Sequence, residues 1–355
     1  MPTAPPATDN PTATAGDWAL ASRSPLTLRT LVETLGATPL EPITILAGGR
    51  HHRVHLKLEA HNPAGSIKDR TALALVQDLE RRGALRPAGH LIESTSGNLG
   101  VALALVCRAY GYRFTAVVDG RATAENVSRM AALGAIIEVV DDTGPGQNHL
   151  AARLDRVAAL CRADPDLVWV NQYGNPANPE VHERTTAPEI LRQAGGRLDA
   201  VFVAVSTCGT LAGLGRHLRR ASPSTRIVAV DAAGSEIFGG PPGPRRLVGI
   251  GAGRRPDFAI DGLYDEVVTV DDETALAVCR DLEAGCGLRV GGSSGAAVAA
   301  CARHVAAVPD AGRVVCVCPD GGDNYASTIG CDDWIHAQGL DLDRARARLG
   351  AVFAP

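Results

Sequence analysis

The chain has 355 residues, of which 45% are hydrophobic and 21% are charged, and its formal net charge is −4. This length and apolar content suffice for one large or two medium domains with a sizeable core. A slightly acidic chain without a long basic run is not expected to bind nucleic acid, and no stretch approaches the about 20 apolar residues of a membrane span. The composition therefore predicts a soluble globular protein.

Residues 1–24 are rich in proline, alanine and threonine and lack the basic start and apolar run of a signal peptide, so we expect a disordered leader there. Nine cysteines at irregular spacings do not form a disulfide framework. Cys316 and Cys318 alternate in VVCVC, which is typical of one face of a buried strand. Three histidines between 51 and 55 lie in a strand-like run without a nearby cysteine. We therefore expect no metal, and a cytoplasmic protein.

From about residue 52 onward, short β-branched runs alternate with longer helical patterns. Strands are expected at 54–59, 90–94, 113–119, 136–140, 199–205, 226–232, 266–270 and 313–318. Helices are expected at 71–85, 98–109, 122–135, 211–221, 272–284 and 294–306. The alternation predicts α/β layers with mostly parallel sheets, and its length predicts two domains with a cleft between them. Ligands bind outside the carboxyl ends of strands in such sheets, so the loops at those ends are candidate sites.

The stretch NPAGSIKDR (62–70) places Lys68 after a turn of small residues and at the start of a helix. The positive end of the helix dipole disfavours a permanent cation there. It suits an amine that must lose its proton, as a lysine does when it forms a Schiff base. Taken alone, the stretch is more typical of an ordinary exposed lysine near a helix start.

Three further loops join a strand to a helix. ESTSGNLG (93–100) gathers hydroxyls and backbone N–H groups at a helix N-terminus, where a carboxylate would fit, and it exceeds what a helix cap needs. STCGTLAGLG (206–215) suits a phosphate, although it is neither a Walker motif nor a clean G-x-G-x-x-G and is a weak signal alone. GGSSGAAVAA (291–300) offers Ser293 or Ser294 as a helix cap or a hydrogen-bond donor to a ligand, and capping alone would explain it.

Together, the four loops supply a Schiff-base lysine, a carboxylate site, a phosphate site and a neutral hydroxyl donor. Pyridoxal phosphate needs an imine, a phosphate cup and a partner for its ring nitrogen. The sequence therefore predicts a pyridoxal-phosphate site in which Lys68 carries the cofactor.

Six spaced motifs follow one another along the chain: NPAGSIKDR, TSGN (95–98), NQYGNPANPEVHERTTAPEI (171–190), GIGAG (249–253), GGSSGAA (291–297) and PDGGDNYAST (319–328). In this set, from about residue 25 to 330, the chain closely resembles the fold-type II pyridoxal-phosphate enzymes, the cysteine synthase and cystathionine β-synthase family. The resemblance implies a tryptophan synthase β-like fold of two α/β domains around a cleft, and a homodimer. The large domain is then expected at 25–66 plus 168–345, and the small, mobile domain at 67–167.

By resemblance, Lys68 forms the internal aldimine, Asn98 hydrogen-bonds the phenolic oxygen of the cofactor, and Ser293 faces the pyridine nitrogen. A neutral hydroxyl there favours loss of a β-leaving group over transamination, and Lys68 is placed to move the α-proton. The expected course is β-elimination to an aminoacrylate, followed by attack of a second nucleophile. The same resemblance implies that the cofactor phosphate is bound by Ser206, Thr207, Cys208, Gly209 and Thr210. It also implies that the substrate α-carboxylate is bound by Thr95, Ser96 and Gly97.

The chain departs from cysteine synthases at two places. The phosphate loop has Ser206 and Cys208 where cysteine synthases carry glycines, and Arg254 and Arg255 follow GIGAG where apolar residues are typical. Two guanidiniums beside the cleft indicate an anionic reactant, unless they form a solvated basic loop. Arg153 and Tyr173 are further candidates to contact the substrates, with Ser206.

These departures make the chain most similar to the N-(2-amino-2-carboxyethyl)-L-glutamate synthases. Those transferases join O-phospho-L-serine to L-glutamate on the route to L-2,3-diaminopropionate, which is used in siderophores and peptide antibiotics. The runner-up is a cysteine synthase that uses O-acetylserine or O-phosphoserine with sulfide, substrates that need fewer cations. Cystathionine β-synthase is disfavoured because its haem-binding extension needs an early cysteine, whereas the first one here is Cys107. A non-catalytic scaffold would be expected to have lost Lys68 or Asn98.

Overall fold

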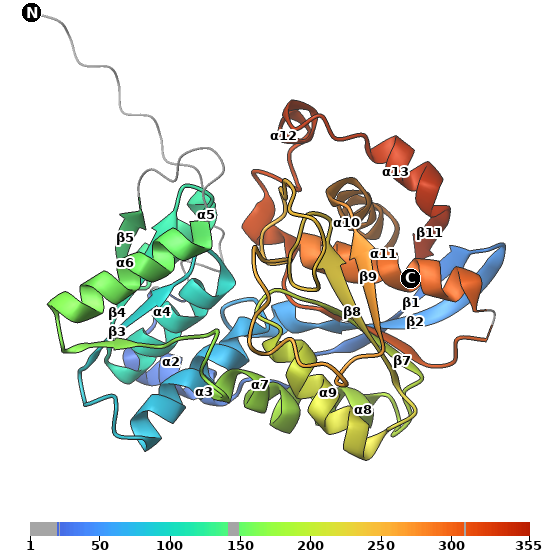
Figure 1. Cartoon of the computed structure of the whole chain (residues 1–355). Helices are drawn as coiled ribbons and strands as arrows, with labels where there is room; N and C mark the ends of the chain where they lie inside the picture. The colour runs from blue at the N-terminus through green and yellow to red at the C-terminus, as the bar shows by residue number, and fades with distance from the viewer. Residues whose placement is uncertain (1–19, 21, 141–148, 309) are drawn as a thin grey trace, which may run out of the picture.

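The computed structural model describes residues 20, 22–140, 149–308 and 310–355. Its strands form two separate sheets, with the smaller on the left of Figure 1 and the larger on the right. The larger sheet has the order β11-β1-β2-β10-β7-β8-β9, and the smaller has the order β5-β4-β3-β6. The predicted leader lies outside the described residues, except for Leu20 and 22–24.

The larger sheet contains β1 (Leu40–Ala47), β2 (Arg50–Leu58), β7 (Ala200–Ala204), β8 (Arg226–Ala232), β9 (Glu266–Val270), β10 (Val314–Cys318) and β11 (Ala351–Ala354). The smaller sheet contains β3 (His90–Ser94), β4 (Arg113–Asp119), β5 (Ile136–Val140) and β6 (Leu167–Trp169). The longer helices are α2 (Pro25–Glu33), α3 (Lys68–Arg81), α4 (Asn98–Tyr110), α5 (Ala124–Ala132), α6 (His149–Ala163), α8 (Ala187–Gln193), α9 (Gly209–Ala221), α10 (Asp272–Cys286), α11 (Gly292–Ala307) and α13 (Leu342–Leu349). Shorter helices are η1 (Glu59–His61), α7 (Ala177–Val181), η2 (His182–Thr186), η3 (Gly322–Tyr325) and α12 (Asp332–Ala337).

All strand pairs of both sheets are parallel, except those that β1 makes with β2 and β11. The predicted α/β class with mostly parallel sheets is therefore confirmed. The antiparallel edge was not predicted. It begins with the β1–β2 hairpin, whose two-residue turn places Gly48 and Gly49 at φ +56° and +73°, a conformation that glycine adopts without strain.

Successive residues of each buried strand point to opposite faces and so contact different helices. In β10, Cys316 and Cys318 pack in the core that includes α10 and α11, whereas Val315 and Val317 pack in the core that includes α8 and α9. The prediction that the two cysteines share one face of a buried strand is therefore confirmed. All nine cysteines lie within the described residues, and all are free thiols.

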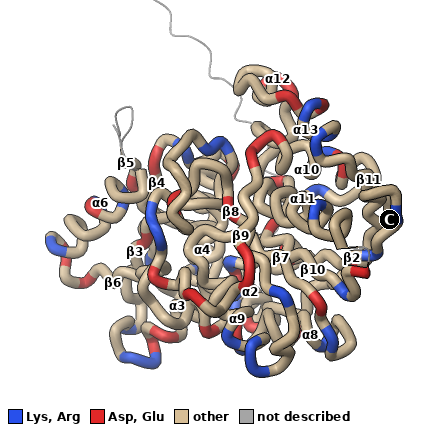
Figure 2. The backbone as a smooth tube through the Cα atoms, turned by 45° about the vertical axis from the view of Figure 1, so that its right-hand side comes forward, with Lys and Arg blue, Asp and Glu red and all other residues tan. Residues whose placement is uncertain are grey.

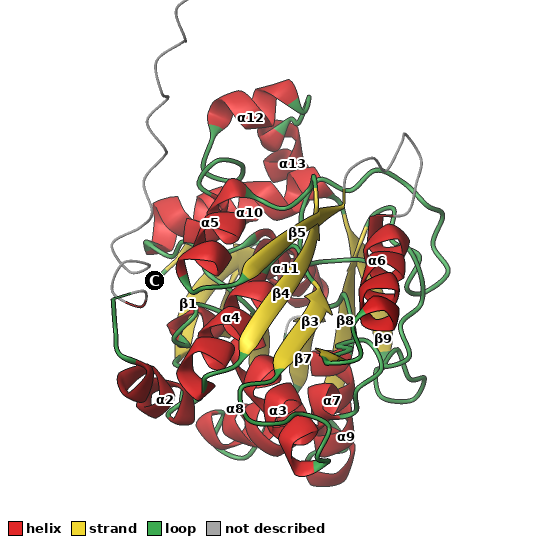
Figure 3. Cartoon of the chain, turned by 90° about the vertical axis from the view of Figure 1, so that its left-hand side faces the viewer, coloured by secondary structure: helices red, strands yellow, loops and turns green. Residues whose placement is uncertain are grey.

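The smaller sheet is covered in the same way (Figure 3). Its one face packs on α6, through Ile92, Val117 and Val157, and its other face packs on the core formed with α3 and α4. Helix α2 also lies on α4, with Leu28 and Val32 fully buried there. Helix α2 thus packs with the helices that cover the smaller sheet. The domain limits expected from the sequence, 25–66 plus 168–345 and 67–167, stay predictions.

Basic and acidic residues are interspersed along the chain (Figure 2). Within the described ranges, no helix is both long enough and apolar enough to cross a membrane. The same residues contain no group of three or more His, Cys, Asp or Glu side chains that could hold a metal ion.

Candidate active site

A cavity of about 710 Å³ opens between the two sheets, at the carboxyl ends of their central strands. All four loops selected from the sequence contribute to its wall: Lys68, the 94–98 segment, the 206–210 segment and Ser293. The 94–98 segment follows β3 of the smaller sheet, and the 206–210 segment follows β7 of the larger sheet. The structure therefore brings together the lysine, the hydroxyl-rich loop, the glycine-containing loop and the serine that the sequence singled out.

Lys68 is the first residue of α3, and the turn before it is held by its own neighbours. Asp69 accepts a hydrogen bond from the backbone N–H of Ala64, and the backbone N–H of Lys68 donates to the Ser66 hydroxyl at 3.2 Å. Burial lowers the pKa of the Lys68 amine, against the opposing charge of Asp320. A neutral amine in this position is the form that reacts with an aldehyde.

The chain has one other lysine, Lys57, and it is already engaged. Its fully buried ammonium donates to the Glu189 carboxylate, to the backbone carbonyl of Thr38 at 2.6 Å and to the side chain of Gln193 at 2.8 Å. Lys68 is therefore the only lysine that lines the cavity.

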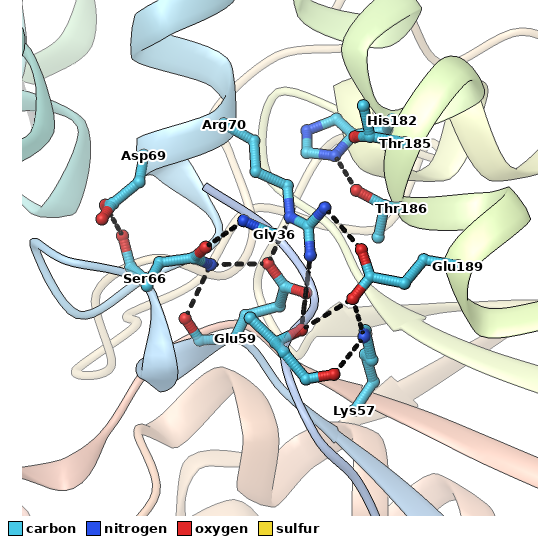
Figure 4. A network of polar contacts seen from close by, with 12 residues as sticks. Gly36, Lys57, Glu59, Ser66, Asp69, Arg70, His182, Thr185, Thr186 and Glu189 are labelled. Carbon is cyan, nitrogen blue, oxygen red and sulfur yellow. Dashed lines mark hydrogen bonds and ion pairs between the residues drawn. The ribbon is translucent and has the colours of Figure 1, made fainter. Parts of the chain in front are cut away.

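A buried ion-pair network lies next to the start of α3 (Figure 4). Arg70, two residues further along α3, donates to both oxygens of Glu59 at 2.8 Å and to Glu189 at 2.9 Å. The side chains of Lys57, Arg70, Glu59 and Glu189 are between 0 and 9% exposed, and their charges sum to zero. Burial alone would raise the pKa of Glu189, but hydrogen bonds from Arg70 and Lys57 hold it below its ordinary value. The network joins the start of α3 to β2 and α8 of the larger domain.

The hydroxyl-rich loop after β3 is fixed by a carboxylate that the sequence did not single out. Glu93 is fully buried and accepts hydrogen bonds from the backbone N–H groups of Ser94 at 2.9 Å and Gln172 at 3.1 Å. Burial raises the pKa of Glu93 to about 7. These bonds tie the segment that contains Thr95, Ser96 and Gly97 to the NQYGN segment, so both approach the same cavity.

Asn98 begins α4 and makes an unexpected buried contact. Its amide donates to Asp320 at 2.6 Å, its carbonyl oxygen accepts from Asn324 at 3.0 Å, and the Tyr325 hydroxyl donates to the same Asp320 oxygen. Burial raises the pKa of Asp320, while hydrogen bonds from Tyr325 and Asn98 and the charge of Lys68 oppose that rise. The second oxygen of Asp320 is buried without a hydrogen-bond partner among the described residues. PDGGDNYAST was recognised as a motif, but no residue of it was assigned a role.

The candidate phosphate loop connects β7 to α9, which spans thirteen residues. Cys208 lies at the N-cap with φ +62°, a left-handed conformation that favours glycine. The backbone thus keeps the conformation that the glycine of cysteine synthases suits, while a thiol now fills part of the wall. Gly209 cannot be larger, because an added Cβ would lie 2.2 Å from the Asn178 side chain.

The residues present fit pyridoxal phosphate. The cavity has a buried amine at Lys68, backbone N–H groups at the start of α9 for a phosphate, and the Ser293 hydroxyl in the first turn of α11. Asn98 and Asp320 supply further polar groups in the same wall. No residue of the 206–210 loop is charged, and all five line the cavity, so an anion there would meet no opposing carboxylate within the loop itself.

The predicted arginines differ in where they lie. Arg153 lines the cavity, contacts the Ser96 hydroxyl and pairs with Asp119 at 3.2 Å. Arg254 stacks over the Tyr173 ring at 5.6 Å, and Arg255 pairs with Asp261 at 2.7 Å. Neither arginine is among the residues that line the cavity, although Tyr173, on which Arg254 stacks, is one of them.

Two arginines that the sequence did not single out do line the cavity, Arg121 after β4 and Arg245 in the connection between β8 and β9. The only available signal for Arg245 was the length of that connection, which is rich in proline and glycine and carries no helix or strand. Loops of that length are commonly functional.

Known proteins share this arrangement. A family model described as "Pyridoxal-phosphate dependent enzyme" matches residues 31–320. The chain is 43% identical over 307 residues to the N-(2-amino-2-carboxyethyl)-L-glutamate synthase of Ralstonia nicotianae, covering 86% of this chain and 91% of the relative. It is 43% identical over 308 residues to the synthase of the same name from Cupriavidus metallidurans, covering 86% and 90%.

Among solved structures, the O-acetyl serine sulfhydrylase isoform 3 of Entamoeba histolytica superposes with a TM-score of 0.79 at 29% identity, over 89% of this chain and 95% of that one. The fold, the cavity around Lys68 and these matches agree with one another. The chain belongs to the pyridoxal-phosphate-dependent enzymes of the cysteine synthase type, which catalyse β-replacement.

Proposed function

We propose that this enzyme is an N-(2-amino-2-carboxyethyl)-L-glutamate synthase, which joins O-phospho-L-serine to L-glutamate for L-2,3-diaminopropionate synthesis. The observation that carries the proposal is the presence of three arginines, Arg121, Arg153 and Arg245, in the wall of the cavity that Lys68 also lines. A phosphate ester and a dicarboxylate together bring several negative charges, which are costly to bury without cations. The 43% identity to synthases of that name supports the same substrates.

In the proposed reaction, the bond between Cβ and the phosphate oxygen of the donor breaks, and a bond between Cβ and the glutamate nitrogen forms. The products are N-(2-amino-2-carboxyethyl)-L-glutamate, inorganic phosphate and the proton that the attacking amine loses. When bound, pyridoxal phosphate supplies the electron sink that makes the donor Cβ reactive.

The chain's own residues divide the remaining tasks. Lys68 holds the cofactor and moves the proton at the donor Cα. Backbone and hydroxyl groups of Thr95, Ser96 and Gly97 bind the donor α-carboxylate. Arg153, with the hydroxyls of Tyr173 and Ser206, stabilises the leaving phosphate. Arg153 suits this task because it is buried beside Ser96, and its pairing with Asp119 fixes the guanidinium before the substrate arrives.

The test is a product assay by mass spectrometry with purified holoenzyme. O-phospho-L-serine or O-acetyl-L-serine is combined in turn with L-glutamate, L-aspartate or sulfide. We expect the tricarboxylate adduct of O-phospho-L-serine and L-glutamate as the main product, and no adduct from the Lys68→Ala variant. Cysteine formed efficiently from sulfide, with glutamate left unconsumed, would instead identify a cysteine synthase.

The sulfide alternative remains because the solved relative from Entamoeba histolytica is named as a sulfhydrylase. Sulfide is small and reactive and needs no guanidinium to orient it. A homodimer and a cytoplasmic location, both expected from the sequence, stay proposals. Sedimentation of the purified enzyme tests the first, and cell fractionation tests the second.

A further inference from the structure

Arg245 is a half-buried cation without a carboxylate partner. It lies in the wall shared by the main cavity and a second hollow of about 420 Å³. Within the ranges that the structure describes, no carboxylate forms an ion pair with its guanidinium, whereas the adjacent Arg246 pairs with Asp272 at 3.8 Å. Burial, followed by the charge of Arg121, lowers the pKa of the Arg245 guanidinium, and the charges of Asp231, Glu236 and Asp272 oppose that fall. Arg121 itself is exposed. The two guanidiniums thus act on each other, and no ion pair within the described ranges holds either of them.

The position of Arg245 is built into the GIGAG loop. Gly251 has φ +74°, and a Cβ added there would lie 2.7 Å from the Arg245 guanidinium, so the guanidinium packs directly on this glycine. The Gly251 carbonyl accepts a hydrogen bond from the Ser206 hydroxyl at 3.3 Å. Arg245 therefore contacts Gly251, and Gly251 in turn contacts Ser206, which belongs to the segment that we assign to the phosphate and the substrate.

Arg121 brings a second guanidinium from the other domain. It follows β4 of the smaller sheet and donates to the backbone carbonyl of Arg245 at 3.0 Å. Among the described residues, this is the only hydrogen bond that its side chain donates. An anion bound between the two guanidiniums would contact both domains and thereby hold the cleft closed around the reactants.

The other cavity arginine does not share these features. Arg153 is already paired with Asp119, and it contacts Ser96 in the hydroxyl-rich segment. Arg121 and Arg245 instead line both the main cavity and the second hollow. An acceptor amino acid must direct its amine inward to the donor Cβ. Its side-chain carboxylate, three carbon–carbon bonds from Cα in glutamate, then trails outward.

We propose that Arg121 and Arg245 form an anion site that binds the side-chain carboxylate of the acceptor amino acid and so selects glutamate. This proposal rests on the proposed function above. A planar guanidinium binds a carboxylate through two parallel hydrogen bonds, and an uncharged amide of the same length cannot replace that interaction. The site thus selects glutamate over glutamine, and it acts after the donor has bound.

The test compares the holoenzyme with its Arg245→Met and Arg121→Met variants, using Arg246→Met as the matched control. Three quantities are measured: single-turnover release of phosphate from O-phospho-L-serine, kcat/KM for L-glutamate against L-glutamine, and calorimetric binding of glutarate, a dicarboxylate without an amine. We expect Arg245→Met to lower the preference for glutamate by about 10- to 100-fold, the range for loss of charge-assisted hydrogen bonds. Glutarate binding should weaken similarly, and phosphate release should stay within about twofold.

The outcomes separate the alternatives. Slower phosphate release with an unchanged preference for glutamate would assign the site to the leaving phosphate, and no change in any measurement would also overturn the proposal. If the wild-type enzyme makes no glutamate adduct, the proposed function fails. Glutarate binding that depends on Arg245 but not on Arg246 would then still support a carboxylate site, and its absence would overturn one.

Discussion

Replacement of Arg70 by methionine is the most direct test of the buried ion-pair network of Lys57, Glu59, Arg70 and Glu189. Methionine keeps a similar unbranched stem but removes four charge-assisted hydrogen bonds, two to Glu59, one to Glu189 and one to the Thr38 hydroxyl at 3.3 Å. Glu59 is fully buried and would lose its guanidinium partner, whereas Glu189 would keep Lys57. The variant therefore leaves an uncompensated carboxylate in the protein interior, where the free-energy cost is largest.

Loss of one partner from a buried ion pair costs about 3–5 kcal/mol. For a cooperative unit of about 250 residues, 1 kcal/mol corresponds to roughly 2 °C in Tm, so we expect a fall of roughly 6–10 °C. Differential scanning calorimetry of the holoenzyme measures this fall. Because Arg70 lies two residues after Lys68 on α3, the affinity for pyridoxal phosphate should weaken together with stability. That affinity is measured by equilibrium dialysis.

Arg81→Met is the matched control on the same helix. Arg81 is 64% exposed, and Asp78 keeps its second partner, Arg82, so we expect a change within about 0.5 kcal/mol. A change in Tm below 2 °C for Arg70→Met would contradict the assignment of a stabilising network. A fall in Tm with normal cofactor affinity would show that the network supports the fold but does not position Lys68.

Three other substitutions test the cavity wall. Borohydride reduction of the holoenzyme and peptide mapping should place the pyridoxyl group on Lys68, and Lys68→Ala should leave the chain unlabelled; label on Lys57 would refute the assignment. The Asp320 charge raises the pKa of Lys68, so Asp320→Asn should lower that pKa. The rate at which the apoenzyme takes up pyridoxal phosphate should then reach half its maximum at a lower pH than in the wild type. A shift to higher pH would contradict the interaction between Asp320 and Lys68. Cys208 has φ +62°, a backbone conformation that is strained for a residue with a side chain. Cys208→Gly should therefore raise the free energy of unfolding, measured by urea titration, by up to about 1 kcal/mol. A fall of more than about 1 kcal/mol would show that the packing of the thiol outweighs this backbone strain.

Much of the fold follows from periodicity. The strands expected at 90–94, 113–119, 136–140, 226–232 and 266–270 coincide with β3, β4, β5, β8 and β9. β3, β4 and β8 are buried on both faces and appear in the sequence as short, mostly apolar runs, whereas β5 and β9 are edge strands with exposed positions whose β-branched residues still mark their limits. The meeting of the four loops also follows, because the carboxyl ends of parallel strands share one edge of a sheet.

The parts that were missed depend on contacts between distant segments. Asn98 and Asp320 are more than two hundred residues apart, and Arg70 contacts Glu59 and Glu189 from two different elements. No local pattern reports such pairs. The edge strand β11 was missed for a similar reason, since its four residues are defined by pairing with β1 and not by a long apolar run.

The arginines show that a residue next to a motif in the sequence need not point its side chain toward the site that the motif forms. Arg254 and Arg255 directly follow GIGAG, yet Arg255 turns outward to Asp261, while Arg245, six residues before Gly251, packs on that glycine. A motif locates the backbone, but the partners of each side chain decide which way its charge points.

The charges of the buried network and of the two cavity arginines explain their different roles. In the network of Lys57, Glu59, Arg70 and Glu189, two cations meet two carboxylates, so every charge is compensated without a ligand. In the cavity wall, Arg121 follows a strand of the smaller sheet and donates to the backbone of Arg245, and no carboxylate among the described residues forms an ion pair with either guanidinium. Like charges that lie near each other repel, and an anion between them is attracted by both. The first cluster is therefore complete in the folded chain, whereas the second is free to pair with an anionic substrate, which is the behaviour expected of a specificity site.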